Sequence, residues 1–248
     1  MMTLSDVAGH FSRAHDYDCH NQLQRLTAEK LLARATLQGH LLDIGAGPGT
    51  DFSLFPVKRV TTVDIAFAMC QRLRSLYPSY GAVCADAATL PFSSGCFDSL
   101  YSNLALQWCP DFAGAVDEAA RVLKPGGRGH FAMVCDGALP ELEALGFCVN
   151  HFAPASQMVA AFSEHDWCEL SIEVATETLH FDDLRTLLYS IKGVGASARH
   201  GAGQAKVLRG RADWLARVDN AERMRTPKGL PLSYEILYVS ALKRGATT

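Results

Sequence analysis

The chain has 248 residues, of which 48% are hydrophobic and 20% are charged, which is typical of a soluble globular protein with room for one large domain. No run of about 18 apolar residues occurs, so we expect no membrane-spanning helix; the first residues also lack the apolar core of a secretory signal. The formal net charge of −3 does not favour a nucleic-acid partner.

In chain order, the first predicted element is a helix over residues 20–37, a stretch rich in Leu, Ala, Gln and Lys that contains no Gly or Pro until Gly39. Short apolar runs then alternate with stretches of helical periodicity up to residue 135, which predicts an α/β fold with a parallel, doubly wound sheet and helices on both faces. The predicted strands are the runs around 41–42, 60–63, 81–85, 97–102, 129–135, 171–178 and 234–242.

Helices are predicted between these strands over 66–76 and 112–123, and the sequence Lys124-Pro125-Gly126-Gly127 predicts a turn. Residues 136–170 and 180–230 are insertions around the late strands. We interpret residues 1–248 as one domain, with N-terminal helices over 1–38 and with the two insertions forming a helical cap over the substrate side.

A glycine-rich turn follows the first predicted strand. It begins at Asp43 and places Gly45, Gly47 and Gly49 at alternate positions. Glycines of this kind allow backbone to approach a bulky ligand closely. The dinucleotide fingerprint G-x-G-x-x-G would require glycine at Thr50, so the turn does not favour a nicotinamide dehydrogenase. A purely structural turn, which binds no ligand, is the alternative interpretation of these glycines.

Acidic residues end the next two predicted strands. Asp64 follows the second strand, about 20 residues after the first glycine, where a carboxylate can accept hydrogen bonds from ribose hydroxyls. Asp86 follows the third strand, where a carboxylate can accept from an adenine amine. Each Asp alone is compatible with a helix cap. In open α/β sheets ligands bind beyond the carboxyl ends of the strands, so the three groups together predict a nucleotide-like site.

Eight cysteines are scattered along the chain, with no C-x-x-C pair and no Cys/His spacing of a zinc site. We interpret them as reduced thiols of a cytoplasmic protein, and we expect no metal. The basic residues are concentrated: residues 185–228 contain ten Lys and Arg but three Asp and Glu, a net charge of +7. That concentration predicts an anionic partner at one place, although solvated helix faces would show the same pattern.

The order of motifs up to residue 135 resembles class I methyltransferases, which bind S-adenosylmethionine over an acidic-x-G-x-G-x-G loop. Further stretches are similar to the family of malonyl-[acyl-carrier protein] O-methyltransferases of biotin synthesis. They are Phe11-Ser12-Arg13-Ala14 with Tyr17, then Ser102-Asn103-Leu104-Ala105-Leu106-Gln107-Trp108, Gly137–Leu142, Ile191–Ala196 and Pro231-Leu232-Ser233-Tyr234.

The resemblance implies transfer of a methyl group from S-adenosyl-L-methionine to the free carboxylate of a malonyl thioester, leaving S-adenosyl-L-homocysteine. The substrate would be malonyl-acyl carrier protein or malonyl-coenzyme A, and the basic segment 185–228 suits an acidic carrier protein. Because a carboxylate is ionised at pH 7, the reaction requires no general base. The residues expected to contact the cofactor are Asp43, Gly45, Gly47, Gly49, Asp64, Ile65, Asp86, Ala87 and Asn103.

Aromatic and basic residues in the similar stretches are candidates for the substrate site, because aromatic rings exclude water and cations clamp a carboxylate. They are Tyr17, Trp108, Lys192 and Arg199, with Arg13 and His151 as further candidates. His151 stands where some relatives have arginine. Packing roles for the aromatic residues and solvated roles for the cations remain open.

Two other functions are compatible with this sequence. One is a class I methyltransferase acting on another small carboxylic acid or a quinone-like acceptor, which would share the cofactor loop. The other is a cofactor-binding protein without catalysis, which the ligand-type residues at three strand ends disfavour.

Overall fold

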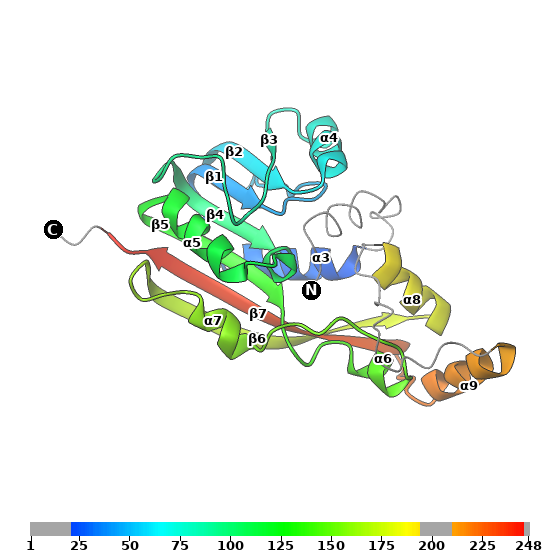
Figure 1. Cartoon of the computed structure of the whole chain (residues 1–248). Helices are drawn as coiled ribbons and strands as arrows, with labels where there is room; N and C mark the ends of the chain where they lie inside the picture. The colour runs from blue at the N-terminus through cyan, green and yellow to red at the C-terminus, as the bar shows by residue number, and fades with distance from the viewer. Residues whose placement is uncertain (1–20, 194–209, 246–248) are drawn as a thin grey trace.

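The computed structural model describes residues 21–193 and 210–245. Within them, seven strands form one sheet in the order β3-β2-β1-β4-β5-β7-β6 (Figure 1). The strands are β1 (Gly39–Ile44), β2 (Val57–Asp64), β3 (Gly81–Cys84), β4 (Phe97–Asn103), β5 (Leu123–Val134), β6 (Trp167–Phe181) and β7 (Leu230–Lys243).

The helices, numbered as in Figure 1, lie on both faces of the sheet and beyond its ends. They are α3 (Gln22–Leu32), α4 (Phe67–Leu76), α5 (Phe112–Val122), α6 (Pro140–Ala144), α7 (Ala155–Ala160), α8 (Leu184–Gly193) and α9 (Arg211–Glu222), with the 3₁₀ turn η1 (Leu106–Trp108).

The order of strands creates a site at one edge of the sheet. β1 pairs in parallel with β2 on one side and with β4 on the other, and β2 and β4 continue in parallel to β3 and β5. β7 is antiparallel to both β5 and β6. These pairings confirm the predicted seven-stranded, mostly parallel sheet. Because the chain reverses its direction of winding between β1 and β4, a crevice opens at the carboxyl ends of these two strands.

Two hydrophobic clusters cover the two faces of the sheet. Leu41 of β1 joins a cluster with residues of α3 and α8, whereas Leu42 and Ile44 join a cluster with residues of α5. All three side chains are buried. A strand that is buried on both faces of a parallel sheet has consecutive apolar residues instead of alternating apolar and polar ones. The consecutive residues Leu41 and Leu42 therefore both indicated this strand.

Two predicted boundaries were wrong. The helix predicted over 20–37 ends at Leu32, because the Thr36 N–H donates to Nε2 of His130 at 3.1 Å instead of to a helical carbonyl. The predicted turn at 124–127 lies inside β5. Leu123 already pairs with Phe97 and Arg128 pairs with Ser99, so the four intervening residues form a bulge within the strand.

The last two strands are longer than the sequence predicted. β6 and β7 remain paired from Trp167–Lys243 to Phe181–Leu230. The alternation of apolar and polar residues fails over part of this length because Glu177 occupies an inward position. Glu177 is buried, accepts from Lys30 of α3 at 2.6 Å and accepts from the Tyr238 hydroxyl at 3.1 Å. A buried ion pair therefore stands at a position where the alternating pattern of a strand predicts an apolar side chain.

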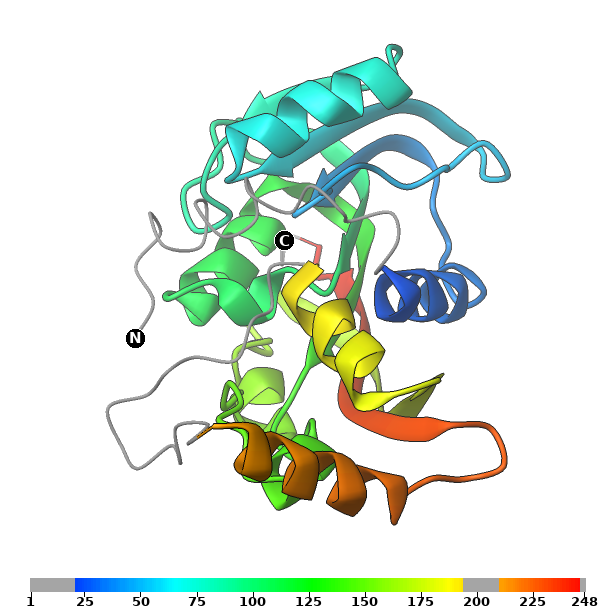
Figure 2. The same cartoon turned by 90° about the vertical axis from the view of Figure 1, so that its right-hand side faces the viewer.

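The two insertions occupy different places. Within 136–170, α7 contributes Met158, and the turn after it contributes Phe162, to the core beneath the face covered by α5. Within 180–230, α8 buries Leu184 and Leu187 against the opposite face, and Figures 1 and 2 show α8 and α9 at the end where β6 finishes and β7 begins. No helix in the described ranges has both the length and the apolar character needed to cross a membrane.

Candidate active site

The glycine-rich turn after β1 has the backbone conformation that glycine allows. Gly45, Gly47 and Gly49 have φ of 71°, 52° and 101°, a region that other residues seldom adopt. A Cβ added at Gly45 would lie 2.0 Å from the Cβ of Ala105, and one at Gly49 would lie 2.8 Å from the Tyr77 ring. The turn is therefore packed closely from beneath as well as shaped for a ligand above.

Asp64, at the end of β2, fixes the turn. One carboxylate oxygen accepts from the Gly47 N–H and the other accepts from the Ala66 N–H, both at 2.8 Å. Burial raises the pKa of Asp64, and the two N–H donors partly offset that rise. Each oxygen keeps a second lone pair, so Asp64 can still accept hydrogen bonds from a ligand.

Asp43, at the end of β1, lies beneath the turn. Its side chain is 1% exposed, and its Oδ2 has no hydrogen-bond partner among the residues that the structure describes. Burial raises the pKa of Asp43 to about 8, and Asp64 adds to the rise. Asp43 is therefore mostly protonated at neutral pH.

The ends of β3 and β4 complete the site. After β3, the Asp86 Oδ1 accepts from the Ala88 N–H at 3.0 Å. At the end of β4, the Asn103 Nδ2 donates to the backbone carbonyl of Gln24 in α3 at 2.9 Å. Leu104 follows with φ of 53°, a conformation that costs about 1–3 kcal/mol for a residue with a side chain. Strain of this kind is concentrated at functional sites.

These groups surround one pocket whose empty volume is about 740 Å³, including the part that opens to solvent. Seven of the nine predicted cofactor residues line it, and Asp43 and Gly49 do not. The lining consists of Ile44, Gly45, Gly47, Val63, Asp64, Ile65, Met69, Ala85, Asp86, Ala87, Asn103, Leu104, Ala105, Leu106, Trp108 and Cys109.

Trp108 is the one predicted substrate residue whose side chain the structure places in the pocket wall. It lies in η1, and its ring packs edge-on against Phe152 with centroids 5.4 Å apart. His151, next to Phe152 in sequence, is exposed. Tyr17, Arg13 and Arg199 lie outside the described residues, and for Lys192 only the backbone, within α8, is described.

Sequence reasoning missed several residues of the site. Met69 and Cys109 line the pocket, and burial raises the pKa of the Cys109 thiol to about 12, so the thiol stays protonated at neutral pH. Cys109 follows Trp108 directly, and that adjacency was the available signal.

Two of the similar stretches meet in space. Glu141 of α6 accepts from the Ser233 hydroxyl at 2.6 Å and from the Ser233 N–H at 3.0 Å. The Leu139 N–H donates to the Ser233 carbonyl at 2.8 Å. The stretches around 137–142 and 231–234 therefore form one junction between α6 and β7.

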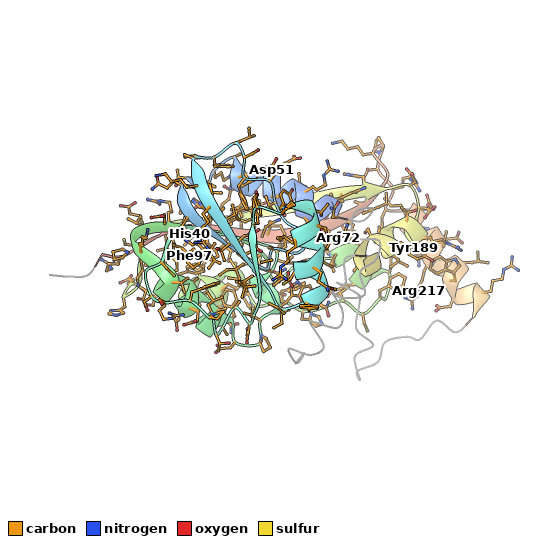
Figure 3. All side chains as sticks on the ribbon, turned by 90° about the horizontal axis from the view of Figure 1, so that it is seen from above. His40, Asp51, Arg72, Phe97, Tyr189 and Arg217 are labelled. Atoms are coloured by element: carbon orange, nitrogen blue, oxygen red, sulfur yellow. The ribbon has the colours of Figure 1, made fainter. Side chains whose placement is uncertain are left out.

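The basic segment 185–228 is not uniformly exposed. Arg217 of α9 is 6% exposed, donates to the Gly146 carbonyl at 3.1 Å, and places its guanidinium 4.5 Å from the centroid of the Phe147 ring. It joins α9 to the segment after α6, and its guanidinium is not displayed at the surface. Figure 3 shows Arg217 and Tyr189 at one end of the molecule and His40 and Phe97 at the other.

Comparisons with known proteins agree with this geometry. Residues 42–131 match the family model described as a methyltransferase domain. The chain is 37% identical to a malonyl-[acyl-carrier protein] O-methyltransferase of Herminiimonas arsenicoxydans, over 95% of each chain.

The chain is 34% identical to the biotin biosynthesis bifunctional protein BioHC of Cellvibrio japonicus, over 96% of this chain but about half (50%) of that longer protein. Among solved structures, the YcgJ protein of Bacillus subtilis superposes with a TM-score of 0.61 at 20% identity, over 90% of this chain and 99% of that one. At that identity the likeness shows the fold.

Proposed function

Because the chain belongs to the family of malonyl-[acyl-carrier protein] O-methyltransferases, we propose that it transfers a methyl group from S-adenosylmethionine to the free carboxylate of a malonyl thioester on an acyl carrier protein. The observation that carries this proposal is the pocket, in which ligand-type groups from four adjacent strand ends lie together with the Trp108 side chain. The product would be the malonyl methyl ester.

The residues of the pocket fit S-adenosylmethionine. The strand order β3-β2-β1-β4 places Asp86, Asp64, the glycine turn and Asn103 in a row. We assign Asp86, with Ala87, to the adenine and Asp64, with Ile65, to the ribose hydroxyls. Gly45 and Gly47 would lie against the sulfur end of the molecule, and Asn103 would contact its amino-acid end. When bound, the cofactor supplies a methyl group activated by a positively charged sulfur.

The protein's own contribution is to align the acceptor and to exclude water. A malonyl carboxylate is already ionised at pH 7, so no residue has to remove a proton. Alignment of reacting groups can supply several kcal/mol, and about 7–11 kcal/mol in the best intramolecular models. We propose that Trp108, which lines the pocket and packs edge-on against Phe152, shields the reacting atoms from water. Tyr17, Lys192 and Arg199 remain our candidates for the carboxylate clamp.

We propose that the exposed cations of α8 and α9 form the surface that docks the carrier protein. Arg185 of α8, Arg211 of α9 and Arg223, which directly follows α9, are exposed. Figure 1 shows α8 and α9 beyond the carboxyl ends of the parallel strands. Carrier proteins are acidic, and charge complementarity acts mainly on encounter and orientation. The seven free thiols among the described residues are compatible with action in the cytoplasm.

Reversal of charge tests the docking surface. The double variant Arg185→Glu with Arg211→Glu should raise the apparent KM for malonyl-carrier protein and leave turnover of malonyl-coenzyme A unchanged. The matched control is Lys58→Glu with Arg59→Glu, because these two cations are also exposed but lie on β2. An equal effect of the two double variants on carrier-protein kinetics would show that α8 and α9 do not dock the carrier.

The reaction itself is tested by following labelled methyl groups from S-adenosylmethionine. We expect label on malonyl-carrier protein at a higher kcat/KM than on malonyl-coenzyme A, and little on free malonate. Label on free malonate at equal or higher efficiency would favour a methyltransferase for small acids. Binding of S-adenosylhomocysteine without turnover of any acceptor would favour a binding protein.

A further inference from the structure

Two cysteines meet where α4 packs on β3, beside the pocket. Cys70 of α4 belongs to a small buried cluster that includes Ala82 of β3. Cys84 follows Ala82 by two residues in the same strand, so both side chains lie on the same face of the sheet. Since Cys70 packs against that face, the side chains of Cys70 and Cys84 both lie between the helix and the strand.

The two sulfur atoms contact the carbonyl oxygens of consecutive residues. The Cys70 sulfur lies 3.6 Å from the carbonyl oxygen of Asp64 and 3.5 Å from that of Val83. The Cys84 sulfur lies 3.6 Å from the carbonyl oxygen of Ile65. A side-chain hydrogen bond joins the two thiols. The fold therefore brings together, as neighbours, two thiols that are 14 residues apart in the chain.

The two thiols differ in their access to solvent. Cys84 is exposed, whereas Cys70 is buried. Burial raises the pKa of the Cys70 thiol to about 11, and Asp64 and Cys84 add to the rise, so Cys70 is protonated at neutral pH. An oxidant in solution therefore reaches Cys84 first and finds a second thiol directly behind it. An accessible cysteine next to a resolving cysteine is typical of thiols that respond to oxidants.

The thiol pair lies directly behind residues that line the pocket. Met69 precedes Cys70 in the chain, Ala85 follows Cys84, and both of these neighbours line the pocket. So do the two consecutive residues at the end of β2 whose carbonyl oxygens the sulfur atoms contact. A covalent bond between the two sulfur atoms would therefore act on four residues of the pocket wall.

We propose that Cys70 and Cys84 form a reversible disulfide when the protein meets a peroxide, and that this bond weakens the binding of S-adenosylmethionine. The Cys84 sulfur attacks the peroxide, whose O–O bond breaks, and water leaves while Cys84 becomes a sulfenic acid. The Cys70 sulfur then attacks the Cys84 sulfur, and the hydroxyl group leaves with the Cys70 proton as a second water. The two thiols together lose two electrons and two protons, and hydrogen peroxide is reduced to two molecules of water.

The disulfide acts on the pocket through the start of α4. It removes both thiol donors from the carbonyl groups of Asp64 and Ile65, and it draws α4 toward β3, because bonded sulfur atoms lie much closer than two thiols in contact. Ala66 caps α4, and its N–H donates to the Asp64 carboxylate at 2.8 Å. A shift of the helix therefore moves the carboxylate that we assign to the ribose. The oxidation site does not depend on the proposed function, but its effect on the cofactor rests on it.

Peptide mapping tests the disulfide. The reduced full-length protein is treated with hydrogen peroxide, and free thiols are blocked before digestion. We expect peptides joined through Cys70 and Cys84 that dithiothreitol separates, and none in the Cys84→Ser variant. Cys168→Ser is the matched control, because Cys168 is a free, partly exposed thiol on β6, at the opposite edge of the sheet from β3, and this variant should form the disulfide as the wild type does. Oxidation of Cys84 to a sulfinic acid without joined peptides would overturn the proposal.

Titration calorimetry with S-adenosylhomocysteine tests the effect on the pocket. The oxidised wild type should bind at least about threefold more weakly than the reduced protein, as expected for a disturbed hydrogen bond to the ligand, and peroxide should leave the affinity of Cys84→Ser unchanged. By linkage, saturating S-adenosylhomocysteine should lower the equilibrium constant for disulfide formation in a glutathione buffer by the same factor.

Equal affinities of the reduced and the oxidised wild type would overturn the effect on the cofactor and leave the proposed function intact. A reduced wild type that binds no S-adenosylhomocysteine would overturn the proposed function, and the peptide map would then decide on the disulfide alone.

Discussion

Replacing Asp43 by Asn should make the protein less sensitive to rising pH. Burial raises the pKa of Asp43 from 3.8 to about 8 in the folded protein. Between these values the folded state keeps the proton and the unfolded state has lost it, so each unit of rising pH lowers the free energy of unfolding by about 1.4 kcal/mol. From pH 5 to pH 7 the wild type loses about 3 kcal/mol through this group, and the Asp43→Asn variant loses none.

The assay is urea unfolding of both proteins, without cofactor, at pH 5 and at pH 7. The difference in the free energy of unfolding, variant minus wild type, should grow by about 3 kcal/mol between the two values of pH. Asp51→Asn is the control, because Asp51 is exposed in the loop that follows β1 and its pKa is lowered by the Ser53 backbone N–H. A difference for Asp43→Asn that stays constant between pH 5 and pH 7 would refute the reasoning.

Three further predictions concern the turn, the cofactor and the basic segment. Gly45→Ala should destabilise the protein more than Gly95→Ala, since both positions have positive φ but a Cβ would meet a neighbour within 4 Å only at Gly45; equal thermal shifts would contradict the close packing. Asp64→Ala should weaken S-adenosylhomocysteine binding at least about tenfold, because it removes charge-assisted hydrogen bonds worth about 1.5–3 kcal/mol each; a change below twofold in calorimetry would remove Asp64 from the site. Arg217→Leu should lower the free energy of unfolding by about 1–3 kcal/mol and Arg211→Leu by less than about 0.5 kcal/mol, whereas equal costs would mean that Arg217 is an ordinary surface charge.

Much of the cofactor side of the site could be predicted from the sequence, because its signals are local. Asp64 and Asp86 each follow an apolar run directly, and the alternation of strands and helices places the ends of parallel strands at one edge. Glycine at alternate positions reports a backbone conformation that few other residues adopt. For these reasons seven predicted residues line one pocket in the structure.

The remaining features depend on contacts between distant parts of the chain. The hydrogen bond from Asn103 of β4 to the Gln24 carbonyl of α3 joins distant segments, and the burial of Arg217 depends on Gly146 and Phe147 of the other insertion. The positive φ of Leu104 could not be predicted from the sequence, because leucine normally avoids positive φ. Neither periodicity nor composition records such contacts.

The central claim is that the methyl group goes to a carboxylate on a carrier-linked malonyl group. The most direct measurement is intact mass spectrometry of malonyl-carrier protein after incubation with the enzyme and S-adenosylmethionine bearing a deuterated methyl group, with acetyl-carrier protein, which has no free carboxylate, as the control. We predict one labelled methyl on the malonyl form, released as methanol by mild base, and none on the acetyl form. Labelling of both forms, or a label that resists base, would contradict carboxyl methylation.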